Sequence, residues 1–369
     1  MVINVDALAT LAAATGAFAQ SNVTLFGIVD AGYASVSNAS TSTAASSKKS
    51  GITNSGLNSS RLGFRGEEDL GGGMKAGFWL ETALANDSDA TTVNFARRST
   101  VSLTGGFGEI RVGRDYTPTF WNTTVYDAFG TNGIGQASTP NLIGLAGVKS
   151  NSTAVRSNNS VSYFTPTIGG FSAQLMVGFG ENSQVGGAAS VSTGNYMGVR
   201  GGYVAGPLSV HAAFGEVKGG TTAKSYALDA ATGLVKETAA STSTAVKSTN
   251  FGASYDLGMI KPALFIGEEK DAAKKVGAVE FSATAPVGPG TIRAAYSKYD
   301  VKNSADDATK FSLGYVYDLS KRTAVYGTYA TVTNKGAQTL SVANNGLTNA
   351  TANAGGKSSG FEAGVRHSF

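Results

Sequence analysis

Cysteine is absent from this chain, and histidine occurs only twice, at His211 and His367. Without thiols the protein can form no disulfide, no thiolate metal site and no cysteine nucleophile. Two imidazoles are also too few for an imidazole-rich metal centre. The sequence therefore predicts neither a metal nor another cofactor, and the lack of thiols suits a protein of an oxidising compartment.

Charged residues are scarce, and long apolar runs are missing. Asp, Glu, Lys and Arg make up 15% of the 369 residues, with a formal net charge of +4 and a hydrophobic fraction of 41%. The charges form no basic tract, which argues against a nucleic-acid partner. No stretch approaches the roughly 20 apolar residues that a membrane helix needs. These shortages argue against a helical membrane protein and an ordinary soluble α/β enzyme.

The N-terminus has the features of an export signal. Residues 7–14 form a short apolar run, and Ala17-Phe18-Ala19 is a small-x-small cleavage motif. We therefore predict a signal peptide over residues 1–19. The signal is atypical, because the leading segment contains Asp6 and neither Lys nor Arg. The alternative is an ordinary core segment, which the sudden start of a new pattern after residue 20 disfavours.

That new pattern has a period of two. In residues 23–33, apolar or small side chains at every second position form one face, and the other face is mixed; residues 171–179, 208–215 and 311–318 alternate apolar with mostly polar or small side chains. Such alternation is typical of a β-strand with one apolar face. No helical period and no domain break interrupt it, so residues 20–369 are predicted to form a single all-β domain.

The connections between the predicted strands alternate in length. Seven short links are rich in turn residues: 69–73, 105–108, 166–170, 206–207, 256–260, 286–289 and 318–321. Eight longer, polar links separate them: 38–50, 86–92, 115–155, 181–195, 218–246, 270–275, 302–309 and 334–357. The count gives sixteen antiparallel strands with every short turn at the same end, which is typical of a transmembrane β-barrel with short periplasmic turns and long extracellular loops.

A soluble β-sandwich also buries one face of each strand, so alternation alone does not exclude it. The short–long rhythm of the connections has no reason to exist in a sandwich. Aromatic residues also gather on the apolar face near the short turns and the C-terminus, as in the girdle at a membrane interface. These residues are Phe171, Tyr203, Tyr255, Tyr317 and Phe369.

The last predicted strand, residues 360–369, alternates up to a terminal aromatic residue, Phe369. A plain edge strand is the alternative, but it would leave an exposed apolar edge of the kind that soluble proteins avoid. The ending resembles the C-terminal signal of outer-membrane barrels, which the barrel-insertion machinery reads. We therefore predict that Phe369 is an assembly signal.

Four segments carry a resemblance to a known family: SNVTLFGIVDAG at 21–32, SRLGFRGEEDLGGGMK at 60–75, GGFGEIRVGRDY at 105–116 and GVRHSF at 364–369. With them the chain resembles the Gram-negative trimeric general porins, particularly their anion-selective branch. The resemblance implies a sixteen-stranded barrel, a homotrimer among outer-membrane lipid and lipopolysaccharide, and passive diffusion of small hydrophilic solutes, with small anions favoured.

The third long link, residues 115–155, is the longest, and a loop of that length in a compact domain usually has a function. In the porin family the third loop folds into the lumen and narrows it. Strand parity places Arg61, Arg98 and Arg156 on lumen faces at similar heights, and the resemblance independently implies a basic cluster there. We predict that the three converge at a pore constriction and attract anions. The alternative is three solvated charges without a common focus.

Asp127, on the third link, is predicted to face the arginines and to set a transverse field. The outer face around Gly27, Ser99 and Gly113 is only weakly apolar, which favours contact with another subunit. A substrate-specific channel and an adhesin are alternatives to a general porin, and a barrel enzyme is a more distant one. An enzyme needs a nucleophile and a base within reach. Neither of the two histidines lies in such a motif.

Overall fold

The structure is a computed structural model. It describes residues 22–86, 93–137, 140–147, 153–181, 192–222, 225–228, 234–238, 241–342, 347 and 351–369. The predicted signal peptide, residues 1–19, lies outside the described residues.

A single antiparallel sheet of 17 strand segments closes on itself through the pairing of its first strand, β1 (Asn22–Asn38), with its last, β21 (Lys357–Ser368). Two segments, β2 (Ser47–Asn54) and β3 (Arg61–Gly71), pair with successive halves of β1 and share one position in the barrel. The structure is therefore a closed sixteen-stranded barrel, which confirms the predicted fold.

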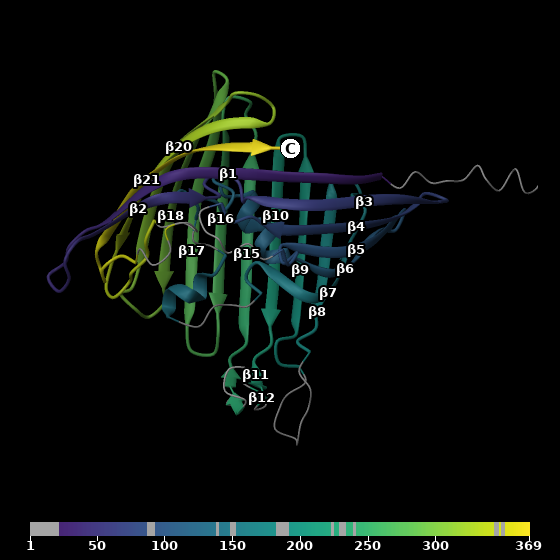
Figure 1. The fold of residues 1–369 in the computed structure, drawn as a ribbon, viewed down its shortest axis with the longest axis horizontal. Helices are drawn as coiled ribbons and strands as arrows, with labels where there is room; N and C mark the ends of the chain where they lie inside the picture. Colours follow the sequence, from purple (N-terminus) through teal and green to yellow (C-terminus); the bar gives the residue numbers. More distant parts are fainter. Residues whose placement is uncertain are drawn as a thin grey trace, which may run out of the picture.

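The other strands follow in meander order. They are β4 (Met74–Ala83), β5 (Arg98–Gly105), β6 (Gly108–Tyr116), β7 (Arg156–Phe164), β8 (Phe171–Gly178), β9 (Tyr196–Ala205), β10 (Leu208–Val217), β15 (Val246–Tyr255), β16 (Lys261–Lys270), β17 (Lys275–Val287), β18 (Gly290–Val301), β19 (Ala308–Asp318) and β20 (Thr323–Asn334). In Figure 1, β3–β6 cross the view horizontally while β15–β17 run vertically. Strands are tilted by roughly 35–45° from the axis of a barrel, so those of the near wall cross those of the far wall when the two walls overlap in the view.

The side chains explain why the sheet closes into a membrane barrel. In β15 the buried and exposed positions alternate strictly over the first seven residues. The outward positions are apolar and open: Val101 is 64% exposed, Phe171 64% and Phe281 60%. Large apolar groups spread over a whole outer face would be costly in water, so this face suits lipid.

The short and long connections lie at opposite ends of the barrel, as predicted. The tight turns between β5 and β6 and between β9 and β10 span only two residues each. The link between β10 and β15, predicted as a long polar link, contains two short two-stranded ladders. They pair β11 (Gly220–Thr222) with β14 (Ser241–Ser243) and β12 (Ser225–Leu228) with β13 (Val235–Thr238), and they extend beyond the barrel wall.

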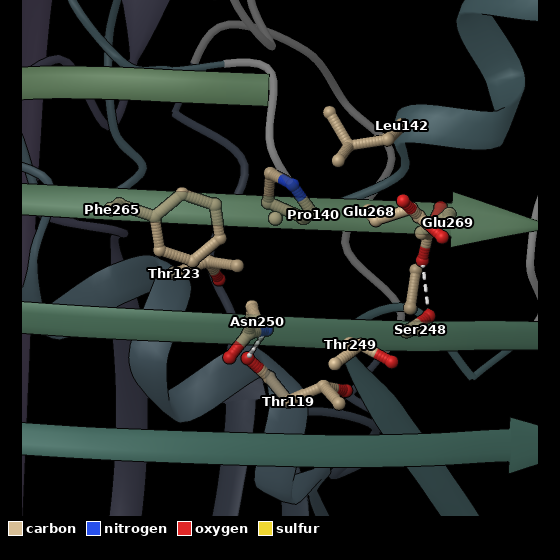
Figure 2. A pocket seen from close by; sticks show the side chains of 12 residues that line it. Thr119, Thr123, Pro140, Leu142, Ser248, Thr249, Asn250, Phe265, Glu268 and Glu269 are labelled. Carbon is tan, nitrogen blue, oxygen red and sulfur yellow. Dashed lines mark hydrogen bonds between the residues drawn. The ribbon is translucent and has the colours of Figure 1, made fainter. Parts of the chain in front are cut away.

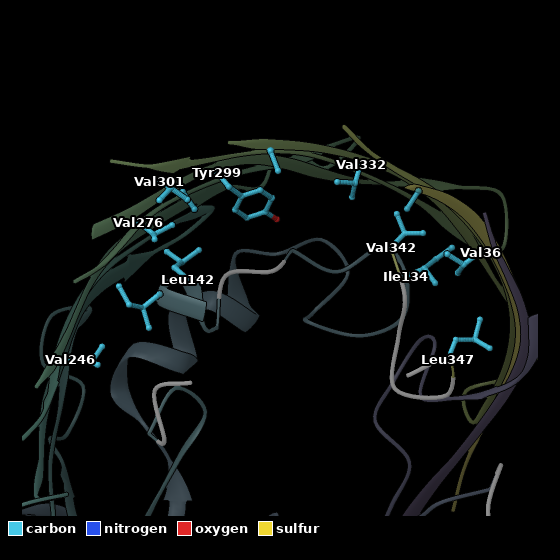
Figure 3. Packing of buried hydrophobic residues seen from close by; sticks show 14 of the residues in the cluster. Val36, Ile134, Leu142, Val246, Val276, Tyr299, Val301, Val332, Val342 and Leu347 are labelled. Atoms are coloured by element: carbon cyan, nitrogen blue, oxygen red, sulfur yellow. The ribbon is translucent and has the colours of Figure 1, made fainter. Parts of the chain in front are cut away.

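The long connection between β6 and β7 folds into the lumen. It contains helix α2 (Pro118–Val125) and the short 3-10 helix η2 (Leu142–Ala146), which lie against β9, β10 and β15–β17. None of the described helices is long and apolar enough to cross a membrane. In Figure 3, Ile134 and Leu142 of this loop meet inward-facing valines of the barrel wall, together with Val342 and Leu347 from the connection before β21.

Hydrogen bonds to the wall fix the third loop in place. The Asn250 side chain donates to the Thr119 carbonyl oxygen at 3.0 Å, as Figure 2 shows. Two wall glutamates accept backbone N–H groups of the loop at 3.0 Å: Glu269 from Ile143 and Glu362 from Ile134. Because the apolar contacts and these bonds both favour the inward position, the loop narrows the lumen.

Candidate functional site

A large internal cavity lies where the third loop faces the wall of β3–β7. Its volume is about 750 Å³. Its lining combines three arginines of the wall, namely Arg61, Arg97 and Arg156, with aromatic and polar residues of the loop. Arg293, from β18, adds a fourth guanidinium.

Tyr116 holds two of these guanidiniums together. Its hydroxyl oxygen accepts hydrogen bonds from Nη2 of Arg97 at 3.1 Å and from Nη2 of Arg156 at 3.0 Å. The guanidinium carbon of Arg156 also lies 4.5 Å from the centre of the Tyr116 ring. The Arg156 Nε–H donates to the carbonyl oxygen of Arg97 at 2.7 Å. These contacts fix the positions of the charges, so little side-chain entropy is left for an ion to remove on binding.

The cluster carries a surplus of positive charge. Glu81 forms salt bridges with Arg97 at 2.6 Å and with Arg61 at 3.5 Å, and its side chain is 6% exposed. Within the described residues no other carboxylate forms a salt bridge with Arg61, Arg97 or Arg156. One negative charge against three positive charges leaves a net of about +2 on this wall, and a narrow lumen concentrates that field.

Arg98, the third arginine of the predicted cluster, lies elsewhere. Parity placed it correctly on the lumen side, but it does not line the cavity. Its guanidinium carbon lies 4.6 Å from the centre of the Trp79 ring, and its Nε lies 3.8 Å from an Asp115 oxygen. Arg97 occupies the cavity wall instead. The sequence pattern does not identify Arg97, because it precedes β5, where strand parity no longer defines the direction of a side chain.

Asp127 also lines the cavity, but its carboxylate is occupied by the loop itself. It is 5% exposed and accepts the backbone N–H groups of Phe129 at 2.7 Å, Thr131 at 2.9 Å and Ala137 at 3.1 Å. Burial raises the pKa of Asp127, and these three hydrogen bonds oppose the rise. The carboxylate therefore shapes the loop, and its transverse field stays a prediction.

The histidines take part in structural contacts. His211 Nδ1 lies 2.6 Å from the hydroxyl of Tyr126 on the third loop, and His367 Nδ1 lies 2.9 Å from the hydroxyl of Thr323. In the described ranges, no group of three or more His, Asp or Glu side chains is placed to hold a metal ion.

Phe369, the predicted assembly signal, lies at the seam where the barrel closes. Its backbone N–H donates to the Gly27 carbonyl oxygen at 3.0 Å, and the Gly27 N–H donates back at 3.1 Å. A Cβ atom at Gly27 would lie 2.3 Å from the Phe369 ring, so the ring covers the backbone of this glycine. The side chain is otherwise open to the outside, at 43% exposure.

Comparison with known proteins agrees with this geometry. The family described as Gram-negative porin matches residues 7–337. The chain is 41% identical to outer membrane porin protein 32 of Delftia acidovorans, with 98% of each chain covered. It is 28% identical to an outer membrane porin protein of Bordetella pertussis, over 88% of this chain and 93% of that one.

Solved structures give the same result. The anion-selective porin from Comamonas acidovorans superposes with a TM-score of 0.78 and 37% identity, over 95% of this chain and 100% of that chain. OmpT, an outer membrane protein of Vibrio cholerae, superposes with a TM-score of 0.63 at 16% identity, over 95% and 98% of the two chains. The second match is a likeness of fold alone.

Proposed function

Since this chain belongs to the family of Gram-negative porins, it is an outer-membrane channel for small hydrophilic solutes, and we propose that it selects anions through the arginines around its internal cavity. The observation that carries the proposal is the fixed cluster of Arg61, Arg97 and Arg156, which a single carboxylate, Glu81, neutralises only in part. The solved relative named as anion-selective supports it.

Location gives these arginines more weight than the net charge of +4 would. At an effective dielectric constant near 20, a unit charge 4 Å from an ion contributes about 4 kcal/mol, against about 1 kcal/mol in bulk water. Charges in the wide vestibules are screened by salt within about 8–10 Å. Chloride, phosphate and small carboxylates are therefore attracted where the lumen is narrow, and cations are repelled there.

The test is single-channel recording in planar bilayers under a KCl gradient. Replacing Arg61, Arg97 and Arg156 with Gln should shift the reversal potential strongly toward cations. The matched control replaces Arg65, Arg200 and Arg366, which face the lumen by parity but do not line the cavity. Equal shifts in the two triple variants would mean that the averaged field of the lumen sets the selectivity, and the proposed site would be wrong.

The remaining parts of the proposal concern export and assembly. Residues 1–19 act as the export signal, and Phe369 is read by the barrel-insertion machinery. The mature chain forms a homotrimer among outer-membrane lipid and lipopolysaccharide, and it acts as a channel without enzymatic activity. Saturation of the current at high solute concentration would favour the second candidate, a substrate-specific channel.

A further inference from the structure

Three aromatic residues adjoin the arginines in the same cavity. Tyr116 ends β6, and Phe120 and Trp121 lie on the first turn of α2; together we call them the aromatic shelf. The Tyr116 and Phe120 rings are stacked with centres 4.9 Å apart, and the Trp121 ring meets Tyr116 edge-on at 5.3 Å. Because Arg156 covers the Tyr116 ring, the cationic and apolar surfaces share a border.

Two residues of the aromatic shelf have evident structural roles. Tyr116 orients two guanidiniums through its hydroxyl. Phe120 is 7% exposed and packs on Tyr116. Trp121 differs, because it is half-buried and lines the cavity, and among the described residues its indole N–H has no hydrogen-bond partner. Apart from the edge-on contact with Tyr116, the described contacts therefore give Trp121 no evident structural role.

An apolar ring that lines a water-filled pore carries a cost. Apolar constrictions disfavour water and so oppose the passage of small hydrated ions. A filter meant for inorganic anions alone would be better lined with polar groups. A solute that carries its own apolar surface can cover the ring. Burial of the two apolar surfaces then stabilises the bound solute, whereas a hydrated ion has no apolar surface to bury.

Resting on the proposed anion selectivity, we propose that this cavity is a binding subsite for carboxylates that carry an aromatic or aliphatic ring. The carboxylate accepts hydrogen bonds from the guanidiniums of Arg61, Arg97 and Arg156, which are suited to planar oxyanions. The ring of the solute lies against Trp121. The cavity of about 750 Å³ falls within the range of about 300–1,000 Å³ that is typical of small-molecule sites.

The test uses block of the chloride current by added solutes in planar bilayers. Benzoate and acetate carry the same charge, so the difference between their half-blocking concentrations reports the contribution of the benzoate ring. We expect benzoate to block wild-type channels at about one-tenth of the acetate concentration, a difference of about 1.4 kcal/mol. Benzyl alcohol, which has the ring but no carboxylate, should not block in this range. Equal block by benzoate and acetate would overturn the subsite.

The two tryptophans of the chain provide matched variants. Trp121→Leu should raise the half-blocking concentration of benzoate about fivefold and leave that of acetate unchanged, whereas Trp121→Phe should keep most of the benzoate block. Trp79→Leu alters a lumen ring that does not line the cavity but donates a hydrogen bond to Glu81 at 3.2 Å, so it should leave the ratio of the benzoate to the acetate value unchanged. A Trp79 effect as large as that of Trp121 would contradict the proposal.

Failure of the subsite and failure of anion selectivity give different results. If the wild-type reversal potential shows no anion preference, the proposed function itself is wrong. If anion preference is present and benzoate blocks no better than acetate, only the subsite is wrong. The wild-type comparison decides this without any variant, so poor folding of Trp121→Leu would not leave the question open.

Discussion

Two neighbouring arginines, Arg97 and Arg98, point to different parts of the lumen. Arg97 lines the cavity and bonds to Glu81 and Tyr116, whereas Arg98 lies over Trp79. We predict that Arg97→Gln lowers the anion-to-cation permeability ratio about threefold, which corresponds to roughly 0.6 kcal/mol of lost ion stabilisation. Arg98→Gln is the matched control and should change the ratio much less. Reversal potentials under a KCl gradient measure both, and an equal or larger effect at Arg98 would contradict this assignment.

These two residues also show which side-chain directions strand parity can predict. Arg156 reaches the cavity although the pairing of β6 with β7 shifts between Gly113 and Asp115, so period two does not explain its direction. Strand parity places Arg61 and Arg98 on the lumen side, because period two holds wherever the pairing is regular. It could not predict which of them share one space, since this depends on the path of the third loop. Arg97 was missed because it precedes the regular strand, where only its backbone N–H bond to Glu81 extends the pairing.

The C-terminal residue offers a second test at this scale. Phe369 contributes one pair of backbone hydrogen bonds and a ring that covers Gly27, and the residue is 43% exposed. We predict that deleting Phe369 lowers the amount of assembled barrel in the outer membrane about tenfold without reducing export to the periplasm, because recognition precedes packing. Cell fractionation and surface labelling measure this. Phe361→Ala removes a 51% exposed aromatic from the same strand and should have little effect. Normal surface levels of the truncated chain would refute the role of Phe369 as an assembly signal.

Among the elements, the third loop depends most on contacts that are distant in sequence. Ile134 and Ile143 are both 0% exposed, and both donate their backbone N–H to wall glutamates. Replacing both with Ser should weaken the docking of the loop by about 2–4 kcal/mol per site. We expect noisier single-channel currents with a higher mean conductance. Val125→Ser on α2 is the control, because Val125 is 49% exposed.

The barrel itself should survive the same change. The β-ladder does not include the loop, so the double variant should keep its different gel mobility before and after boiling. Unchanged current noise and conductance in a folded double variant would show that the loop does not need these contacts. The length of the link predicted a functional loop, but its docking sites could not be predicted, since Ile134 and Glu362 lie 228 residues apart.

At the scale of the whole molecule, the described outer wall is largely apolar, and Arg114 of β6 is a charged side chain within it. Arg114 faces outward after an irregularity in the pairing of β6 with β7, and it donates to the Ala96 carbonyl oxygen and to the Asn158 side chain. The sequence predicts Gly113 on this outer face. The structure pairs Gly113 with the buried Thr100, so the glycine faces inward and Arg114 joins Ser99 outside.

The position of Arg114 bears on the proposed trimer. It lies six residues beyond Gly108, where β6 begins, which places it about 14 Å above the short turn and near the middle of an apolar band about 25 Å tall. An arginine exposed to lipid at that depth costs about 2–4 kcal/mol. A neighbouring subunit that supplies polar contacts removes this cost. The Arg114 face is therefore the part of the wall that another copy is expected to cover.

We predict a heat-modifiable homotrimer whose mobility on gels changes on boiling, with Arg114 in its interface. Arg114→Leu removes the polar contacts while suiting lipid, so the single barrel should fold and conduct while the trimer dissociates at lower temperature. A loss of about 1.4 kcal/mol per interface would favour dissociation about tenfold. The control is Leu313→Ala on β19, where Leu313 is 46% exposed and lies outside the Arg114 face. Native gels over a temperature series and the multiplicity of conductance steps report the assembly. If Leu313→Ala weakens the trimer and Arg114→Leu does not, the interface lies on the other wall. A chain that inserts alone, in single conductance steps, would refute the trimer.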